Sequence, residues 1–380
     1  MRLLREQFDI YTASIRGPDR PSQQLSLDER EEAKRTYYIK PAGPGSACAA
    51  LAAALVASPL RFIAGLSYAV RLAGFQLKQL ALNLAYFAQA AMVGRWMHRN
   101  GLTHLHTHYS STVALLVHKT FGVEISISFH GPDEFTDPAG LWVREKVAAC
   151  KFARAISQYA RCQLMIASAV SDWGKIEVIY MGVDPDTFHP RPLPRSTSPV
   201  EILCVGRLSP VKAQHILIEA IDMLVHEGRD LLLHIVGGGP DRQALEREVT
   251  QRGLQDRVIF HGFTPQNKLD SLYRQADIFA LPSFAEGVPG VLMEAMAMAI
   301  PCVSTWVAGI PELIRSGIDG LLVPPSDTSA LADAIRQLVT DPELRLRVGQ
   351  AGRQRVIEKF DLRKNSAGLA NVIRRYGAAE

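Results

Sequence analysis

The sequence has few of the features that mark secreted or disulfide-stabilised proteins. It contains five cysteines in 380 residues, and no two of them form a C-x-x-C pair. Scattered thiols of this kind are typical of a reducing compartment, so we expect free cysteines and a cytoplasmic protein. The first seven residues also lack the apolar stretch of a signal peptide, and we expect no secretory leader.

Long hydrophobic runs and a strong net charge are missing as well. The apolar run over residues 47–60 ends at Arg61 and is too short to cross a bilayer. The net charge of +4 comes from 42 basic and 38 acidic residues, and no zinc-finger or RNA-binding signature is present. We therefore expect neither a transmembrane helix nor a nucleic-acid partner.

Acidic residues are absent from residues 41–123, and most of this stretch is expected to form two or three helices. A basic, acid-free helical region can lie on an anionic membrane surface, at the inner face of the cytoplasmic membrane. Packing of the same helices on a sheet is the alternative, and the two are compatible if one face is exposed. The cations in the middle of the stretch are Arg61, Arg71, Lys78, Arg95 and Arg99.

Strand and helix patterns alternate on both sides of a proline-rich segment. Four prolines in residues 189–199 prevent regular structure there. The alternation predicts an α/β fold with two Rossmann-like, doubly wound parallel-sheet domains, whose ligands would bind in the cleft between them. The predicted parts are an N-terminal domain over 1–188, the linker over 189–199, a C-terminal domain over 200–360, and a helix over 361–380 that packs back on the N-terminal domain.

Two carboxylates eight residues apart bracket the most informative stretch. Glu286 lies in a loop broken by glycine and proline, and Glu294 lies in the apolar helical run behind it. Backbone N–H groups at such a helix start favour an anion, and Gly287 and Gly290 let a ligand approach the backbone. Acids beside these amides suit a ligand with phosphates and hydroxyls, such as a nucleotide sugar. The spacing alone leaves an alternative open, in which Glu286 caps the helix and Glu294 is solvated.

Two cations follow the strand predicted over residues 200–205. Gly206 opens a turn there, and Arg207 and Lys212 are placed to reach a ligand at the carboxyl end of the strand. Beside an anion-binding helix start they suit a diphosphate, although two solvated loop cations would give the same pattern. The glycine turn at 237–239 is not a G-x-G-x-x-G fingerprint, and it fits a nucleotide contact or a plain tight turn.

Histidines mark the N-terminal half of the chain. His130 follows a predicted strand, where it could bond a sugar hydroxyl or stabilise developing charge. His104, His106 and His108 alternate on another predicted strand and share one face, so three metal ligands are conceivable. No Asp, Glu or Cys accompanies them in the sequence, and we predict no metal site.

Together these motifs resemble those of family 4 glycosyltransferases, which have the GT-B fold. With residues 103–108, the pattern resembles the colanic-acid-type branch that builds exopolysaccharides. The segments that carry the resemblance are 205–212, 237–240, the E-x7-E pair, 304–314 and 320–325, with 129–133 and 181–188 in the first half.

The resemblance implies transfer of a hexose, with retention of anomeric configuration, from a UDP- or GDP-hexose to a glycan or polyprenyl-diphosphate-linked acceptor. It implies no cofactor and no essential metal. By position, Arg207 and Lys212 would hold the diphosphate, Glu286 the donor-sugar hydroxyls and Glu294 the ribose hydroxyls. His130 would contact the sugar near the reacting carbon, and the leaving phosphate would take the acceptor's proton. The remaining donor-binding candidates are Gly206, Gly238, Gly287, Val288, Pro289, Gly290, Val291 and Leu292.

The sequence departs from the family pattern at two places. Residues 1–10 resemble the helix end and second strand of the family's first unit, so we expect the first strand to be missing. A non-catalytic nucleotide-sugar-binding or scaffold protein of the same fold is therefore the alternative function, and a GT-B-fold epimerase is a third. Ala299 stands where many members have glycine, which predicts a tighter helix end.

Overall fold

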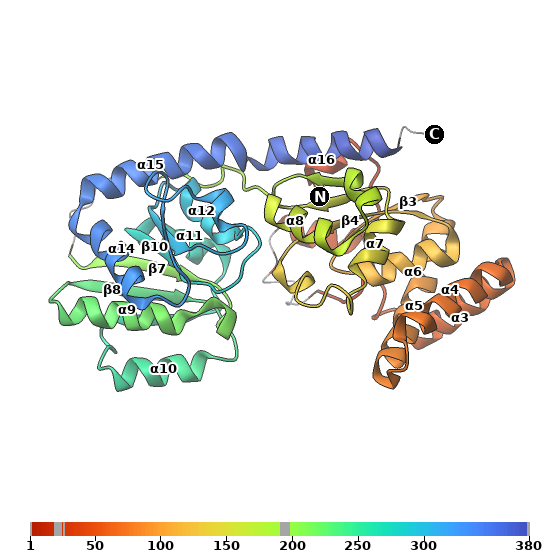
Figure 1. The fold of residues 1–380 in the computed structure, drawn as a ribbon, viewed down its shortest axis with the longest axis horizontal. Coiled ribbons are helices and arrows are strands. Elements are labelled where there is room, and N and C mark those ends of the chain that lie inside the picture. Colours follow the sequence, from red (N-terminus) through yellow and green to blue (C-terminus); the bar gives the residue numbers. More distant parts are fainter. Residues whose placement is uncertain (1, 19–24, 26, 191–197, 378–380) are drawn as a thin grey trace. The chain divides into compact units, whose positions relative to one another are not determined.

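A computed structural model shows two compact units, each built around a parallel sheet (Figure 1). The division places Ile156–Ala160 and Ile179–Leu369 in the second unit and the rest of the chain in the first. The second unit thus begins before the predicted linker, of which residues 191–197 lie outside the described residues. The structure describes residues 2–18, 25, 27–190 and 198–377.

The second unit contains a six-stranded sheet in which every described strand pair is parallel. Its strands are β7 Val200–Val205, β8 Leu231–Val236, β9 Val258–Gly262, β10 Ile278–Leu281, β11 Cys302–Thr305 and β12 Leu321–Val323. They lie in the order β12-β11-β10-β7-β8-β9. Because β7 has β10 on one side and β8 on the other, the loops that follow these three strands emerge at one edge of the sheet.

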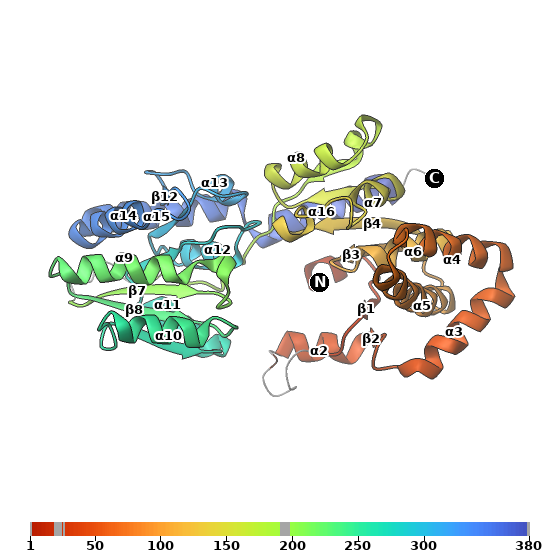
Figure 2. The ribbon, with the colours of Figure 1, turned by 60° about the horizontal axis from the view of Figure 1, so that its bottom comes forward.

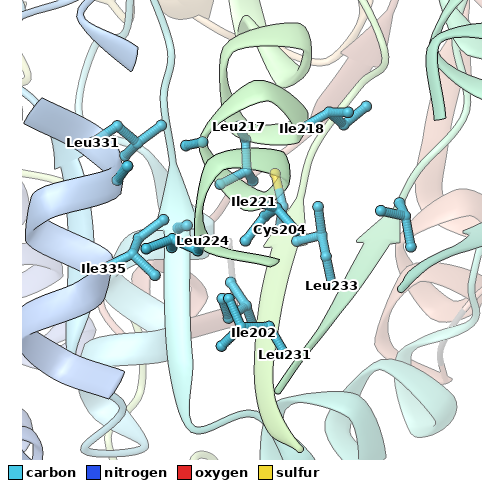
Figure 3. Close-up of a cluster of buried hydrophobic side chains, with 14 of the residues drawn as sticks. Ile202, Cys204, Leu217, Ile218, Ile221, Leu224, Leu231, Leu233, Leu331 and Ile335 are labelled. Carbon is cyan, nitrogen blue, oxygen red and sulfur yellow. The ribbon is translucent and has the colours of Figure 1, made fainter. Parts of the chain in front are cut away.

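Alternate residues of β7 enter two different cores. Ile202 and Cys204 pack under helix α9 (Gln214–His226), with Leu217, Ile221 and Leu224 of that helix above them (Figure 3). Leu203 and Val205 belong to the core on the opposite face. A strand buried on both faces explains why residues 202–205 are all apolar.

Helices cover both faces of this sheet. The helices of the second unit are η4 Pro210–Lys212, α9, α10 Arg242–Gln251, α11 Gln266–Gln275, α12 Gly290–Ala297, α13 Ile310–Leu313, α14 Thr328–Thr340 and α15 Pro342–Lys359. Helix α14 packs with α9 on one face, and α11, α12 and α15 contribute to the core on the other.

The first unit contains a four-stranded parallel sheet in the order β3-β4-β5-β6 and a separate parallel pair, β1-β2. The strands are β1 Thr12–Ser14, β2 Thr36–Tyr38, β3 His104–His108, β4 Glu124–Phe129, β5 Ala153–Ala155 and β6 Ile176–Val178. Strand β2 occupies residues that the polar pattern alone would place in a helix or loop.

Three long helices, α3 (Gly43–Ala57), α4 (Pro59–Ala73) and α5 (Leu77–Arg99), pack against one another at one side of the first unit (Figure 2). Phe87 of α5 is buried in the core with residues of α3, α4 and α6. No described helix is long and apolar enough to cross a membrane. The other helices in or reaching this unit are α1 Arg2–Arg5, α2 Leu27–Arg35, α6 Ser111–Phe121, η2 Pro132–Glu134, α7 Val143–Ala149, α8 Gln158–Ala167, η3 Val170–Lys175 and α16 Leu362–Gly377.

From Ala370 onward, α16 belongs to the first unit. The Tyr376 ring lies 5.3 Å from the Phe152 ring, and Arg375 forms an ion pair with Glu177. These contacts hold the last turns of the chain on the first unit.

A cavity of about 1040 Å³ lies inside the first unit. Residues 8–15, which include β1, form one part of its lining, and residues 102–110, which include β3, form another. Among the described strands, β3 pairs only with β4 and β1 only with β2. One edge of β3 is therefore free of a strand partner in the described part of the chain.

Candidate functional site

Two glycine loops meet at the carboxyl ends of β7 and β8. The Gly206 N–H donates to the Val236 carbonyl at 2.9 Å, and the Leu208 N–H donates to the Gly238 carbonyl at 3.0 Å. Gly237 has a φ of 137°, and a Cβ there would lie 1.9 Å from the Gly206 carbonyl oxygen. Gly237 is therefore required by the fold, whereas a Cβ at Gly238 would meet nothing within 4 Å.

Lys212 and Glu286 form an ion pair beside these loops. The Ser283 hydroxyl donates to the same Glu286 Oε1 at 2.7 Å, and Glu286 is only 7% exposed. The Phe284 N–H donates to the Val211 carbonyl at 2.8 Å, which joins the loop after β10 to η4. The carboxylate is thus fixed by a cation and a hydroxyl, while its second oxygen still has lone pairs for a ligand.

Arg207 is exposed at the carboxyl end of β7, and its backbone is held by Gln214. The Gln214 side chain is buried, and its Nε2 donates to the Arg207 carbonyl at 3.0 Å. The Gln214 Oε1 atom is buried without a partner in the described part of the chain. Sequence reasoning missed Gln214, because a glutamine at a helix start carries no distinctive signal.

Helix α12 begins beside the ion pair and points its first N–H groups at the same edge. Pro289 precedes the helix, and no side chain caps it. Glu286 is therefore not the helix cap, which excludes that alternative. The side chains of Val288 and Leu292 are buried in the core, so these residues can offer a ligand only backbone groups. A Cβ at Gly290 would meet nothing within 4 Å, so the helix start is open to a ligand.

Glu294 is partly buried in the middle of α12 and is held by Tyr273 of α11. The Tyr273 hydroxyl donates to Glu294 Oε2 at 2.9 Å and also lies 3.4 Å from the Val291 carbonyl. Burial raises the pKa of Glu294 above its usual value. The alternative of a freely solvated Glu294 is therefore wrong. Tyr273 was not predicted from the sequence, since a contact across 21 residues depends on how two helices pack.

Gly287 is packed closely against the loop after β11. A Cβ on Gly309 would lie 2.2 Å from the Gly287 carbonyl oxygen, so Gly309 cannot be enlarged without moving this loop. The second unit thus brings together every predicted site residue except His130.

His130 lies in the first unit, directly after β4. Its Nε2 lies 2.5 Å from the Nδ1 of His108, and its ring stacks on Tyr109 with centroids 4.7 Å apart. The Glu134 carboxylate accepts the His130 backbone N–H. Burial, with His108 and Arg154 nearby, lowers the pKa of His130 to about 3. The ring is therefore neutral near pH 7 and can accept or donate one hydrogen bond.

The other histidines of β3 bond to serines instead of forming a metal centre. His104 Nε2 lies 2.8 Å from the Ser126 hydroxyl, and His106 bridges Ser126 and Ser128 at 2.7 and 2.9 Å. Over the described residues, no group of three or more His, Cys, Asp or Glu side chains is arranged to hold a metal ion.

A model of the family described as "Glycosyl transferases group 1" matches residues 186–355. This range contains both glycine loops, the Lys212–Glu286 pair and α12. The match to the glycosyl transferases group 1 family covers a little under half of the chain. The family 4 resemblance predicted from the E-x7-E motif is thereby confirmed for this part of the chain.

Named glycosyltransferases match the same chain over about half of its length. It is 40% identical over 208 residues to the "Putative colanic acid biosynthesis glycosyltransferase WcaL" of Escherichia coli K12, which covers 52% of this chain and 51% of that protein. It is 34% identical over 207 residues to the amylovoran biosynthesis glycosyltransferase AmsK of Erwinia amylovora, covering 53% and 51%. The chain therefore spans about half the length of these curated relatives.

Solved structures of glycosyltransferase fold agree with the architecture. Anabaena Alr3699/HepE, solved in complex with UDP, matches with a TM-score of 0.65 at 22% identity, over 76% of this chain and 82% of that one. Sucrose-phosphate synthase from Thermosynechococcus elongatus matches with a TM-score of 0.69 at 24% identity, over 77% and 79%. The predicted GT-B class, with two parallel-sheet α/β domains, is confirmed.

Proposed function

We propose that this protein is a retaining glycosyltransferase that moves a hexose from a nucleotide diphosphate sugar to a lipid-linked glycan acceptor. We place the reaction in exopolysaccharide biosynthesis, in the cytoplasm at the inner face of the membrane. The observation that carries the proposal is the Lys212–Glu286 pair beside the open start of α12 and two glycine loops. The named roles of WcaL and AmsK support the biosynthetic setting.

The diphosphate is the group that this edge of the sheet fits best. The N–H groups in the first turn of α12 have no partner within the helix, and they carry the positive end of its dipole. The Arg207 guanidinium offers a fork of donors and the Lys212 ammonium a point charge. Because Glu286 already orients Lys212, the cation needs little reorganisation when charge develops on the leaving phosphate. No cofactor or metal is part of the proposal.

Two carboxylates are placed to bind the two sugars of the donor, the transferred hexose and the ribose. Glu286 has one oxygen held by Lys212 and Ser283, which leaves the other for a hydroxyl of the transferred hexose. Glu294 stands in the second turn of α12, beyond the helix start, and would accept the ribose hydroxyls. Tyr273 fixes its carboxylate for that role.

The transfer step needs no enzyme base. The bond between the anomeric carbon and the diphosphate oxygen breaks, and the acceptor oxygen bonds to the same carbon on the same face. The acceptor's proton passes to the leaving phosphate oxygen, so charge and atoms balance. For His130 we keep the predicted role at the donor sugar, since a neutral imidazole can bond a hydroxyl.

Both uridine and guanosine donors are compatible with the relatives. One solved structure holds UDP, and a mannosyltransferase of Mycolicibacterium smegmatis, 32% identical over 234 residues, is named as GDP-mannose-dependent. Calorimetry with UDP- and GDP-hexoses, followed by a transfer assay on lipid-linked glycan, tests the proposal. Donor binding without transfer would support the non-catalytic alternative, and no binding of either donor class would contradict both.

Gly238→Ala is the sharpest variant for this test. Its Cβ has free space in the fold, so stability should not change, but it would stand where a donor approaches the backbone. We expect at least a tenfold loss of donor affinity, equivalent to about 1.4 kcal/mol. Gly174→Ala, which also meets nothing within 4 Å but lies in the first unit, is the matched control.

A further inference from the structure

Helix α4 and its two ends expose an unusual amount of apolar surface. Val56 and Leu60, at the junction with α3, are 82% and 83% exposed. Phe75 and Leu77, at the junction with α5, are 107% and 83% exposed. Single exposed apolar residues are ordinary, but four almost fully exposed large ones at the ends of one helix are a patch that needs a partner.

The exposed residues continue along α4 between these ends. Leu60, Ile63 and Val70 are all exposed and share one face of the helix, and Ala69 and Ala73 on the opposite side are buried. A helix of 15 residues is about 22 Å long. The outward face is therefore a stripe of that length in which Leu60, Ile63 and Val70 alternate with the exposed Ser67 and Arg71, and an apolar cluster lies at each end.

Cations accompany the stripe and acids do not. Arg71 and Lys78 are exposed and flank Phe75 in the sequence. Arg61 donates to the Phe121 carbonyl at 3.0 Å and so is directed toward the end of α6. The sequence contains no Asp or Glu in residues 41–123, so helices α3, α4 and α5 carry no acid beside Arg71 and Lys78.

We propose that α4, with its two ends, lies in the headgroup region of an anionic lipid bilayer. A helix with an apolar outward face and flanking cations binds lipid in this way, with the apolar side chains entering the acyl boundary. A protein partner would be expected to meet hydrogen-bonding groups at regular intervals, and along the stripe only Ser67 and Arg71 offer them. The surface shares no residue with the phosphate site, so it does not depend on the proposed transfer.

Vesicle flotation with the full chain tests this surface. The native protein should float with vesicles that contain phosphatidylglycerol and much less with phosphatidylcholine alone. Leu60→Glu with Phe75→Glu should abolish flotation with both. Arg71→Gln with Lys78→Gln should weaken binding to the phosphatidylglycerol vesicles by at least tenfold, since each cation near such a surface contributes about fivefold to the affinity. The same variant should leave binding to vesicles of phosphatidylcholine alone unchanged.

Matched controls lie on the same unit. Ile166→Glu changes an apolar side chain that is 74% exposed on α8, and Arg144→Gln removes an exposed cation on α7. Both should float like the native protein, and circular dichroism should show all variants folded. Loss of flotation in these controls equal to that of the α4 variants would overturn the assignment.

A fluorescent variant reports depth directly. Phe75→Trp should be quenched by lipids brominated on the acyl chains, and Ile166→Trp should not. Absence of native flotation, or a Phe75→Trp signal that brominated lipid leaves unchanged, would refute the proposal. A native dimer that Leu60→Glu with Phe75→Glu converts to monomer would instead assign the stripe to a second copy of the chain.

Discussion

At the scale of single residues, the second unit buries a charge and gives it one cation. Glu286 is 7% exposed and its carboxylate contacts Lys212 and Ser283. Such an arrangement stabilises little by itself, but removing one partner leaves an uncompensated buried charge. Lys212 thus serves the fold as well as any ligand.

Lys212→Met should therefore destabilise the second unit by about 3 kcal/mol, because the Glu286 carboxylate loses its counter-charge. Adding Glu286→Gln should restore most of that loss, since the neutral amide can still accept the Ser283 hydrogen bond. Chemical denaturation of the two variants measures both effects. A double variant no more stable than Lys212→Met alone would contradict the role of the pair.

The histidine pair of the first unit predicts a pH dependence. Burial lowers the pKa of His108 to about 4 and that of His130 to about 3, both below the ordinary histidine value. Between about pH 6.5 and 4 the unfolded chain then binds more protons than the folded one, so the free energy of unfolding falls on acidification. For His130 the slope reaches at most about 1.4 kcal/mol per pH unit, and for His108, whose side chain is exposed, solvent screening makes it smaller.

Replacing both by glutamine, His108→Gln with His130→Gln, should flatten that part of the stability curve. Denaturation of the native protein and of the variant across this pH range measures the contribution of the two histidines. All other groups titrate in both proteins, so their effect cancels in the difference. Parallel curves would mean that the two rings do not titrate on unfolding.

At the scale of elements, the end of α12 adopts a conformation that suits glycine better than its actual residue. The Ala299 N–H donates to the Met296 carbonyl and the Ile300 N–H to the Ala295 carbonyl, which is a Schellman ending. Ala299 has a φ of 57°, where a Cβ is strained. The departure from glycine seen in the sequence thus has a local energetic cost.

Ala299→Gly should stabilise the second unit by about 1 kcal/mol, because it removes that strain. Thermal unfolding checks the prediction. Ala297→Gly, two residues earlier at the last residue of α12, should destabilise the second unit by about the same amount and serves as the control. A loss of stability in Ala299→Gly would contradict the strain.

Elements with a strong local pattern could be predicted, and long-range pairs could not. The strand over residues 200–205 could be predicted with its observed bounds because it is mostly apolar and is bounded by loops. Strand β2 could not be predicted, since three residues directly after a charged helix are too few to show the alternation of polar and apolar residues that is typical of a strand. The contact between Tyr273 and Glu294, and that between Lys212 and Glu286, join segments whose packing no local pattern specifies.

At the scale of the whole molecule, the two units have separate cores and each should unfold as its own cooperative step. A nucleotide bound at the start of α12 should raise the free energy of unfolding of the second unit alone. The increase should be about 2.7 kcal/mol at a nucleotide concentration one hundred times Kd. Calorimetric scans with and without UDP or GDP measure this. At the same nucleotide concentration, a tenfold weaker Gly238→Ala should keep no more than about 1.4 kcal/mol of this rise. An equal rise in both steps would contradict the assignment of the site to one unit.

The one-sided pairing of β3 has a consequence for the exchange of its amide hydrogens. The Thr103 carbonyl accepts from Glu124, so the N–H groups of Leu105 and Thr107, two and four residues on, also point toward β4. Those of His106 and His108 point to the edge that borders the cavity. Hydrogen–deuterium exchange should therefore alternate along this strand, slow at Leu105 and Thr107 and fast at the histidines. Uniform protection would reveal a further strand bound along that edge.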